Sequence, residues 1–217
     1  MIDWLNPIAT LIASFGGAWA AFKLQSVERT RDVRRANITA ANRALMTMMQ
    51  QANTLKLYQE DQIDPRREHP GRHLAIRATL PHELDALRFD FKSLDFLDSP
   101  KEQQLLFELS VEERRFTETL RAINARSEIL LTEVDPKLSS AGFLDGGSYE
   151  SKDLKQALGQ PLYNKLKRLT DDVIHHVDRT NESIVEMKNK FLLAARARYP
   201  GTKFVDFEFP DASTAAS

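Results

Sequence analysis

The sequence contains no cysteine and only eight glycines in 217 residues. The absence of cysteine excludes disulfides, thiolate metal ligands and thiol catalysis. Glycine is scarce, and long stretches lack both glycine and proline, which favours long helices. Neither sign of charge predominates, since 30 basic residues stand against 31 acidic ones. The overall charge signature of a nucleic-acid-binding protein is therefore missing.

Recognisable catalytic motifs are also missing. The chain has no phosphate-binding loop, dinucleotide fingerprint, nucleophile elbow or HExxH zinc motif. Its arginines and lysines are not interleaved with aromatic residues on one helix face, which argues against binding of single-stranded nucleic acid. We therefore predict no catalytic residue, no cofactor, no enzyme activity and no nucleic-acid partner.

The most unusual feature of the sequence is an uncharged stretch near its beginning. Residues 4–22 carry no charge between Asp3 and Lys23, and this length is close to the roughly 20 residues that span a bilayer. A signal peptide would carry its positive charge before such a run, whereas here the basic residues follow it. The pattern predicts a transmembrane helix over 4–23 with residues 1–3 as its extracytoplasmic end. By the positive-inside rule the bulk of the chain then lies on the cytoplasmic side of an inner membrane.

Within this stretch, small and polar residues gather on one side of the helix and large apolar residues on the other. Small residues four positions apart let two helices approach closely in lipid, and polar side chains beside them can hydrogen-bond across the contact. The pattern predicts a self-associating span and a homo-oligomer. A plain anchor and the core helix of a soluble protein are the alternative interpretations. The predicted association face consists of Asn6, Ala9, Thr10, Ala13, Ser14, Gly17 and Ala21.

Basic residues follow the uncharged stretch. Each basic residue near anionic headgroups contributes roughly 1 kcal/mol to membrane binding. We therefore predict anionic lipids as partners of this segment, and the simpler interpretation is a solvated helix face. The predicted headgroup contacts are Lys23, Arg29, Arg31, Arg34 and Arg35.

The remainder of the chain predicts a helical bundle. Neither glycine nor proline occurs from Ala18 to Asp64, so the first helix should continue as a membrane-proximal helix over 24–60. A second long helix should begin at the capping box of Ser99 and Glu102 and run to about Val134. A third should run from Pro161 to about Tyr199. All three carry apolar residues in alternating steps of three and four, which is typical of a coiled-coil seam.

The predicted fold class is mainly α, with the transmembrane helix continuing into an antiparallel, coiled-coil-like bundle of three long helices. Residues 61–209 form the remainder of the bundle. They include a short extended C-terminal segment with strand-like alternation at Val205, Phe207 and Phe209. Residues 210–217 are predicted to be a flexible tail. For residues 85–97, helix and short strand are equally compatible with the pattern.

One segment has weak metal-binding character. In TDDVIHHVD, Asp172 and His175 form a single Asp-x-x-His motif, and His176 follows directly. A di-metal bundle needs a Glu-x-x-His motif on each of two helices and two further glutamates, for which Glu112 and Glu113 are the candidates. Ordinary surface pairs at helical spacing fit the segment better, so no metal is predicted. A separate group, His69, His73 and His82, lacks the spacing of a zinc site.

The order of elements carries a loose resemblance. A membrane-proximal helix, the turn LDFLDSP and the helix ELSVEERRFTETLRAINARSE resemble small, uncharacterised bacterial single-span membrane proteins with a cytosolic helical bundle. The resemblance covers the predicted anchor and residues 99–134, and it implies no established activity. Some bacterial membrane proteins of this build act as effectors in antiphage defence.

These observations predict a membrane-anchored, self-associating helical-bundle protein that acts through protein–protein interaction, with the bundle offered to a protein partner. One alternative is a membrane-perturbing effector of the antiphage-defence type, whose small-residue face assembles into a bundle or pore. A soluble, metal-dependent helical-bundle enzyme is the second alternative.

Overall fold

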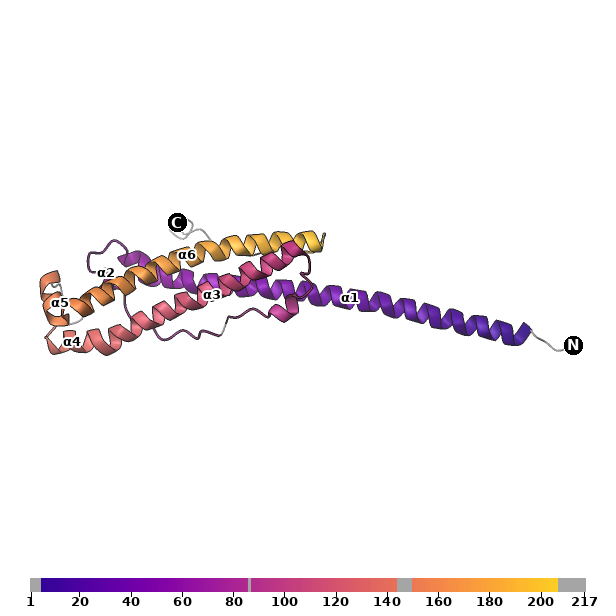
Figure 1. Cartoon of the computed structure of the whole chain (residues 1–217), viewed down its shortest axis with the longest axis horizontal. Helices are drawn as coiled ribbons and strands as arrows, with labels where there is room; N and C mark the ends of the chain where they lie inside the picture. Colours follow the sequence, from indigo (N-terminus) through magenta and orange to yellow (C-terminus); the bar gives the residue numbers. More distant parts are fainter. Residues whose placement is uncertain (1–4, 86, 144–149, 207–217) are drawn as a thin grey trace, which may run out of the picture.

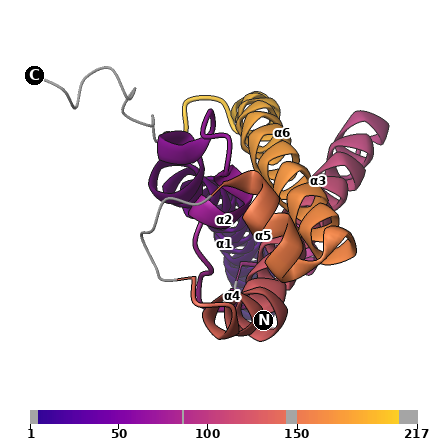
Figure 2. The ribbon, with the colours of Figure 1, turned by 90° about the vertical axis from the view of Figure 1, so that its left-hand side faces the viewer.

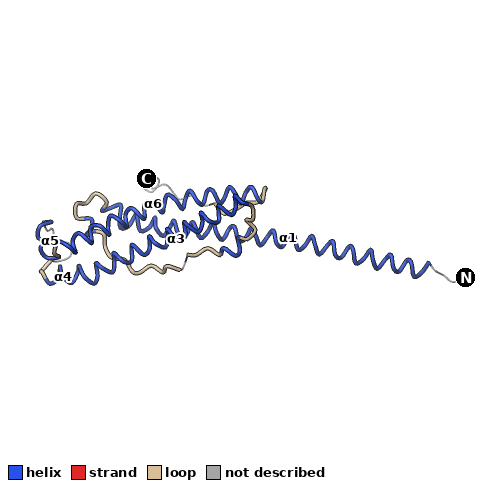
Figure 3. The backbone as a smooth tube through the Cα atoms, in the orientation of Figure 1, coloured by secondary structure: helices blue, strands red, loops and turns tan. Residues whose placement is uncertain are grey.

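Long helices dominate the structure, and no strand occurs within residues 5–85, 87–143 and 150–206, which are the residues that the computed structural model describes (Figure 3). Three helices account for most of the chain: α1 (Leu5–Tyr58), α3 (Pro100–Ile129) and α6 (Gln160–Arg198) (Figure 1). Helices α3 and α6 run antiparallel, since Glu108 pairs with Lys190 while Arg126 contacts Thr170. The prediction of a mainly helical bundle built from several long helices is confirmed.

Short elements join the long helices. A π-turn and a 3-10 turn, η1 (Gln59–Ile63) and η2 (Asp64–Arg66), end α1, and the single turn α2 (Arg72–Ala75) follows. The turn η4 (Leu130–Val134) ends α3, and α4 (Asp135–Ser140) and α5 (Ser151–Leu158) lead to α6. Within 85–97, the described residues (85 and 87–97) contain no strand, and their one helical element is the 3-10 turn η3 (Phe91–Leu94). The described part of the C-terminal segment, residues 202–206, is not a strand, and Phe207, Phe209 and the tail 210–217 lie outside the described residues.

The start of α3 shows how local sequence determines a helix boundary. The side chain of Ser99 accepts a hydrogen bond from the backbone N–H of Glu102, whose carboxylate in turn accepts one from the N–H of Ser99. Two of the free N–H groups at the helix start are thereby satisfied, and Pro100 supplies a fixed φ in the first turn. The capping box predicted from the sequence is confirmed.

The core lies where the apolar seams of the three long helices meet. Seam positions expected to point inward are buried on each of them, and a second, smaller core at the far end joins η4 and α5 to the beginning of α6. Such large buried side chains stabilise a helical bundle mainly through apolar burial. Buried seam residues include Ala41, Leu45, Met48 and Leu55 on α1, Leu109, Phe116 and Ile123 on α3, and Val173, Ile184 and Phe191 on α6.

Between α2 and α3 the chain crosses the bundle without forming a long helix. We name residues 77–98 the strap. It bridges two helices, because Gln51 of α1 donates to the carbonyl of Leu87 while Asn124 of α3 binds both the N–H and the carbonyl of His82. The strap also buries Phe89, Leu94 and Leu97 in the core. Figure 1 shows this segment running along the bundle.

The first part of α1 leaves the bundle. Residues 5–36, which we name the arm, project as a single helix of about 48 Å, given 32 residues at about 1.5 Å each (Figure 1). Figure 2, viewed along the bundle, shows the remaining helices grouped around the other end of α1. From Ala21 to Ala36 every side chain is exposed, and the first buried residue after this stretch is Ala40.

The prediction of a transmembrane helix over 4–23 does not find support in the structure. Among the helices of the described residues, none combines the length and the apolar character needed to cross a bilayer. Trp4 lies outside the described residues. The prediction relied on the absence of charged residues from this stretch. Glycines, polar residues and a proline in the same stretch lower its mean hydropathy.

Candidate functional site: the arm and its junction with the bundle

Large apolar side chains on the arm are exposed to solvent. Trp19, Phe22 and Leu24 are 66%, 71% and 67% exposed, and Val27 and Val33 are exposed as well. The ammonium of Lys23 lies 4.7 Å from the centre of the Trp19 ring, which is a cation–π contact. A helix generally gains most of its stability from packing of its apolar face, and the arm has no such packing within the described chain.

The predicted association face falls mostly outside the described side chains. Asn6, Ala9, Thr10, Ala13 and Ser14 belong to the helical backbone of α1, but their side chains are not among those the structure describes. Gly17 and Ala21 are described, and both are exposed. A methyl group added at Gly17 would meet no atom within 4 Å, so the described bundle leaves this position open for another molecule.

The five basic residues predicted to contact headgroups are all exposed. Residues 23–35 contain these five and only two acidic residues, Glu28 and Asp32, so the segment carries a net positive charge. Their distances from Phe22 along the helix axis differ widely, because each residue adds about 1.5 Å. Lys23 directly follows Phe22, whereas Arg34 and Arg35 lie about 18 Å and 20 Å from Phe22 along the axis. The guanidinium of Arg34 stacks instead on the ring of Tyr199, 5.6 Å from its centre.

Two side-chain contacts hold α1 where it enters the bundle. Asn37 donates to the hydroxyl of Tyr199 at the end of α6, over 2.9 Å. One turn further, Asn42 accepts a hydrogen bond from the backbone N–H of Val205, also over 2.9 Å. Helix α6 and the segment after it therefore bind α1 at the junction. These contacts set the direction in which the arm leaves the bundle.

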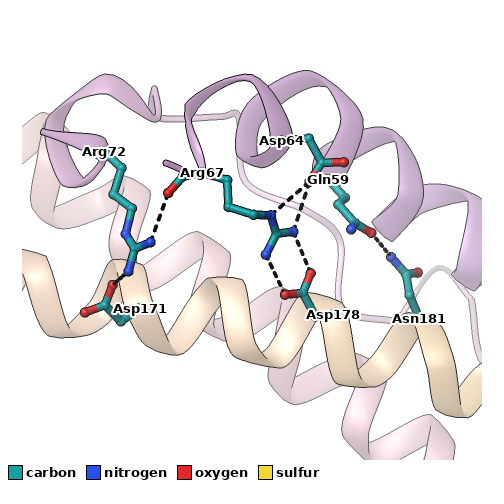
Figure 4. Close-up of polar contacts among 7 residues, drawn as sticks. All are labelled: Gln59, Asp64, Arg67, Arg72, Asp171, Asp178 and Asn181. Carbon is teal, nitrogen blue, oxygen red and sulfur yellow. Dashed lines mark hydrogen bonds and ion pairs between the residues drawn. The ribbon is translucent and has the colours of Figure 1, made fainter. Parts of the chain in front are cut away.

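The side chains of the segment TDDVIHHVD, which lies on α6, face two different neighbours. Its aspartates face the segment that follows α1. Asp178 accepts two hydrogen bonds from Arg67, at 2.7 and 2.9 Å, and Asp171 accepts one from Arg72 at 2.6 Å (Figure 4). The hydrogen bond with Asp178 raises the pKa of Arg67. These contacts tie η2 and α2 to α6, so Asp171 and Asp178 have a structural role.

His175 and His176 point to the other side of α6. Their rings lie 6.1 Å apart and line a groove of about 310 Å³ beside α3, together with two arginines and two glutamates. Asp172 is exposed. Within the described residues, no group of three or more histidine, aspartate or glutamate side chains is placed to hold a metal ion.

The glutamates that the metal interpretation required have other partners. Glu112 accepts hydrogen bonds from Ser183 of α6, at 2.7 Å, and from Arg115 on its own helix, at 2.6 Å. Glu113 faces the strap and accepts a long hydrogen bond of 3.4 Å from the N–H of Phe89. Burial raises the pKa of Glu113, because few polar groups replace the lost water.

Among the residues whose burial the structure describes, the most deeply buried charged one is Arg126, which has no exposed surface. It donates to the hydroxyl of Thr170 at 2.9 Å and to the carbonyls of Ile76 and His73 at 2.6 and 3.1 Å. Arg126 therefore closes the end of α2 and the start of the strap onto α3 and α6. The sequence signal for this role was an arginine at a seam position of the second long helix.

Comparison of the chain with protein-family models, with curated proteins and with solved structures finds no match in any of the three.

Proposed function

We propose that this protein is a membrane-associated helical-bundle protein, in which the arm binds lipid and the bundle is offered to a protein partner. The observation that carries the proposal is the exposure of Trp19, Phe22 and Leu24 on a helix that projects away from its own core. Burial in an apolar phase contributes about 1.5–3 kcal/mol for each large apolar side chain. Tryptophan and phenylalanine beside a lysine are typical of helices that bind at the membrane interface.

The sequence of the arm favours lipid over a second copy in water as the occupant. A coiled coil between two arms would continue the seam of α1 outward from Ile38 in steps of three and four. Val27 and Leu24 fit such a seam, but Arg34 and Arg31 lie between them and Ile38. Burying these two arginines would cost several kcal/mol per charge. Lipid needs no such seam, because the apolar end of the arm can insert while the arginines stay in water.

Vesicle flotation with the full-length protein tests the proposal. We expect the protein to float with vesicles of phosphatidylcholine and phosphatidylglycerol, and to float less with phosphatidylcholine alone. Phe22→Glu should prevent flotation, because it places a charge among the inserted side chains. The matched control is Val33→Glu, which lies on the same helix about 16 Å further from the tip and should float normally.

Two outcomes would contradict the proposal. One is full-length protein that stays at the bottom of the gradient with every vesicle. The other is equal flotation of Phe22→Glu and Val33→Glu, which would assign lipid binding to another surface. Crosslinking of two arms in water without vesicles would favour a second copy as the occupant. Resistance of bound protein to an alkaline carbonate wash then tells an integral arm from one at the surface.

Self-association in the membrane is the second part of the proposal. The exposed Gly17 and Ala21 would let two arms approach closely in lipid. Gly17→Ile should therefore reduce crosslinking of vesicle-bound protein while leaving flotation unchanged. Unchanged crosslinking would assign any oligomer to the bundle.

A further inference from the structure

The base of the strap is held by a buried cation whose acceptors are all neutral. In the described part of the chain, Arg126 binds the hydroxyl of Thr170 and the backbone carbonyls of His73, Ile76 and Arg77. Burial lowers the pKa of Arg126, because no carboxylate among these partners compensates for the lost water. A further positive charge in this region is therefore unfavourable while the strap is closed.

Two histidines lie in the same region. His73 on α2 is only 3% exposed, and its Nε2 atom, like that of His82 in the strap, is buried without a hydrogen-bond partner in the described protein. A protonated imidazole donates from both nitrogens, so each ring is accommodated here in its neutral form. Protonation would leave a buried N–H donor unpaired at both positions.

The neighbours of His73 oppose its protonation. Lys167 of α6, Arg126 of α3 and Arg72 of its own helix are the cations around it, and Asp171 of α6 is the one anion that offsets them. Its ring packs edge-on against Tyr163 of α6, with centroids 4.7 Å apart. Burial, reinforced by Lys167, lowers the pKa of His73.

His82 contacts uncharged groups of α1 and α3. Its ring lies edge-on to that of Tyr58 of α1, with centroids 6.4 Å apart, and Asn124 of α3 holds its backbone. Burial alone lowers the pKa of His82. Tyr58 in turn lies beside Arg126, the residue that binds the carbonyl of His73.

We propose that α2 and the strap together form an acid-sensitive clasp, which mild acid releases from α1, α3 and α6 through proton uptake by His73 of α2 and His82 of the strap. Once α2 and the strap are released, both rings meet water and titrate near the ordinary histidine value of about 6.5. The open state therefore binds more protons than the closed state below that pH, and the closed state loses stability as the pH falls. Release would uncover the apolar surface that Phe89, Leu94 and Leu97 cover.

Protonation of Glu113, the carboxylate that faces the strap, has the opposite effect on the stability of the closed state. Because the pKa of Glu113 is raised in the closed state, its protonation favours closure, so it cannot account for release in acid. Keeping the experiment above pH 5.5 also keeps it above the ordinary range of carboxyl groups, about 3.9 to 4.3.

Hydrogen exchange of the full-length protein, followed by mass spectrometry between pH 7.5 and 5.5, tests the clasp. Labelling times are lengthened at low pH to match intrinsic exchange. We expect the protection of amides in 77–98 to fall by up to about tenfold per pH unit below 6.5 for each proton taken up. Amides of α6 from Ile184 to Ala195, remote from both histidines in the sequence, should keep their protection and serve as the internal control.

Variants assign the effect to the two rings. His73→Gln and His82→Gln carry no titrating group, so each should flatten part of the pH dependence and the double variant should abolish it. His69→Gln, at an exposed position of the preceding loop, should behave as wild type. The wild-type series is decisive even where a variant fails to fold. Equal pH responses of strap and α6, or an unchanged response in the double variant, would overturn the proposal.

Discussion

The two halves of α1 belong to one helix but lie in different surroundings. Residues 37–58 place Ala41, Leu45 and Leu55 in the core, whereas the arm exposes Trp19 and Phe22 to solvent. Apolar residues occur in both halves, so hydrophobic content alone does not decide which half is buried. The difference lies in the seam, which is continuous from Ile38 onward and is interrupted by Arg31 and Arg34 before it. Helix formation and burial are thus separate consequences of the sequence.

The largest expected difference between the bundle and the arm is the loss of stability when a phenylalanine is replaced by alanine. Phe116→Ala and Phe191→Ala should each lower the free energy of unfolding by about 3–5 kcal/mol, because both side chains are almost fully buried. Phe22→Ala on the arm should change it by less than about 0.5 kcal/mol. Denaturant unfolding in detergent measures all three. Similar losses at Phe22 and Phe116 would mean that the arm packs against the bundle.

Arginine gives a second contrast. Arg126→Ala should lower the free energy of unfolding by about 3 kcal/mol, because it leaves several buried carbonyls without donors. Arg31→Ala on the exposed arm should leave stability unchanged and weaken vesicle binding by no more than about 1 kcal/mol. Thermal unfolding measures the effect on stability, and vesicle flotation measures the effect on binding. A silent Arg126→Ala would show that water or a relaxed strap replaces the guanidinium.

Lysine gives the smallest contrast. Lys188 is buried and its ammonium lies 3.0 Å from the carboxylate of Asp206, so Lys188→Ala should cost about 1–2 kcal/mol. Lys23→Ala, which removes only an exposed contact with Trp19, should cost at most a few tenths. Chemical denaturation resolves the first effect, and equal values for the two lysines would place Asp206 away from α6.

Sequence patterns were sufficient for the long helices and for the core. The capping box at Ser99 and Glu102 and the apolar seams are local or periodic signals, and each acts through residues a few positions apart. Phe116, Ile184 and Phe191 occupy positions of these seams and are buried. The resemblance to single-span membrane proteins and the missing charges over 4–22 pointed to a membrane helix, which the structure does not support.

Features that depend on distant residues were decided by the tertiary structure. Residues 77–98 form the strap because Gln51, Glu113 and Asn124, far away in the sequence, bind its backbone at Leu87, Phe89 and His82. Lys188 lies between two seam positions and reads as a surface residue, yet the returning C-terminal segment covers it and supplies Asp206. Asp171 is one helical turn before His175 in the sequence, but in the folded protein it binds Arg72.

The long helices, their starting points and the apolar face of each follow from neighbours within one or two turns, so the amino-acid sequence is enough to predict them. The free-standing arm, the burial of Arg126 among carbonyls and the position of His73 beside it follow from the tertiary structure. Hydrogen bonds and burial at these positions depend on which helices meet. Residues 50 positions apart, such as Ile76 and Arg126, come into contact only when the bundle closes.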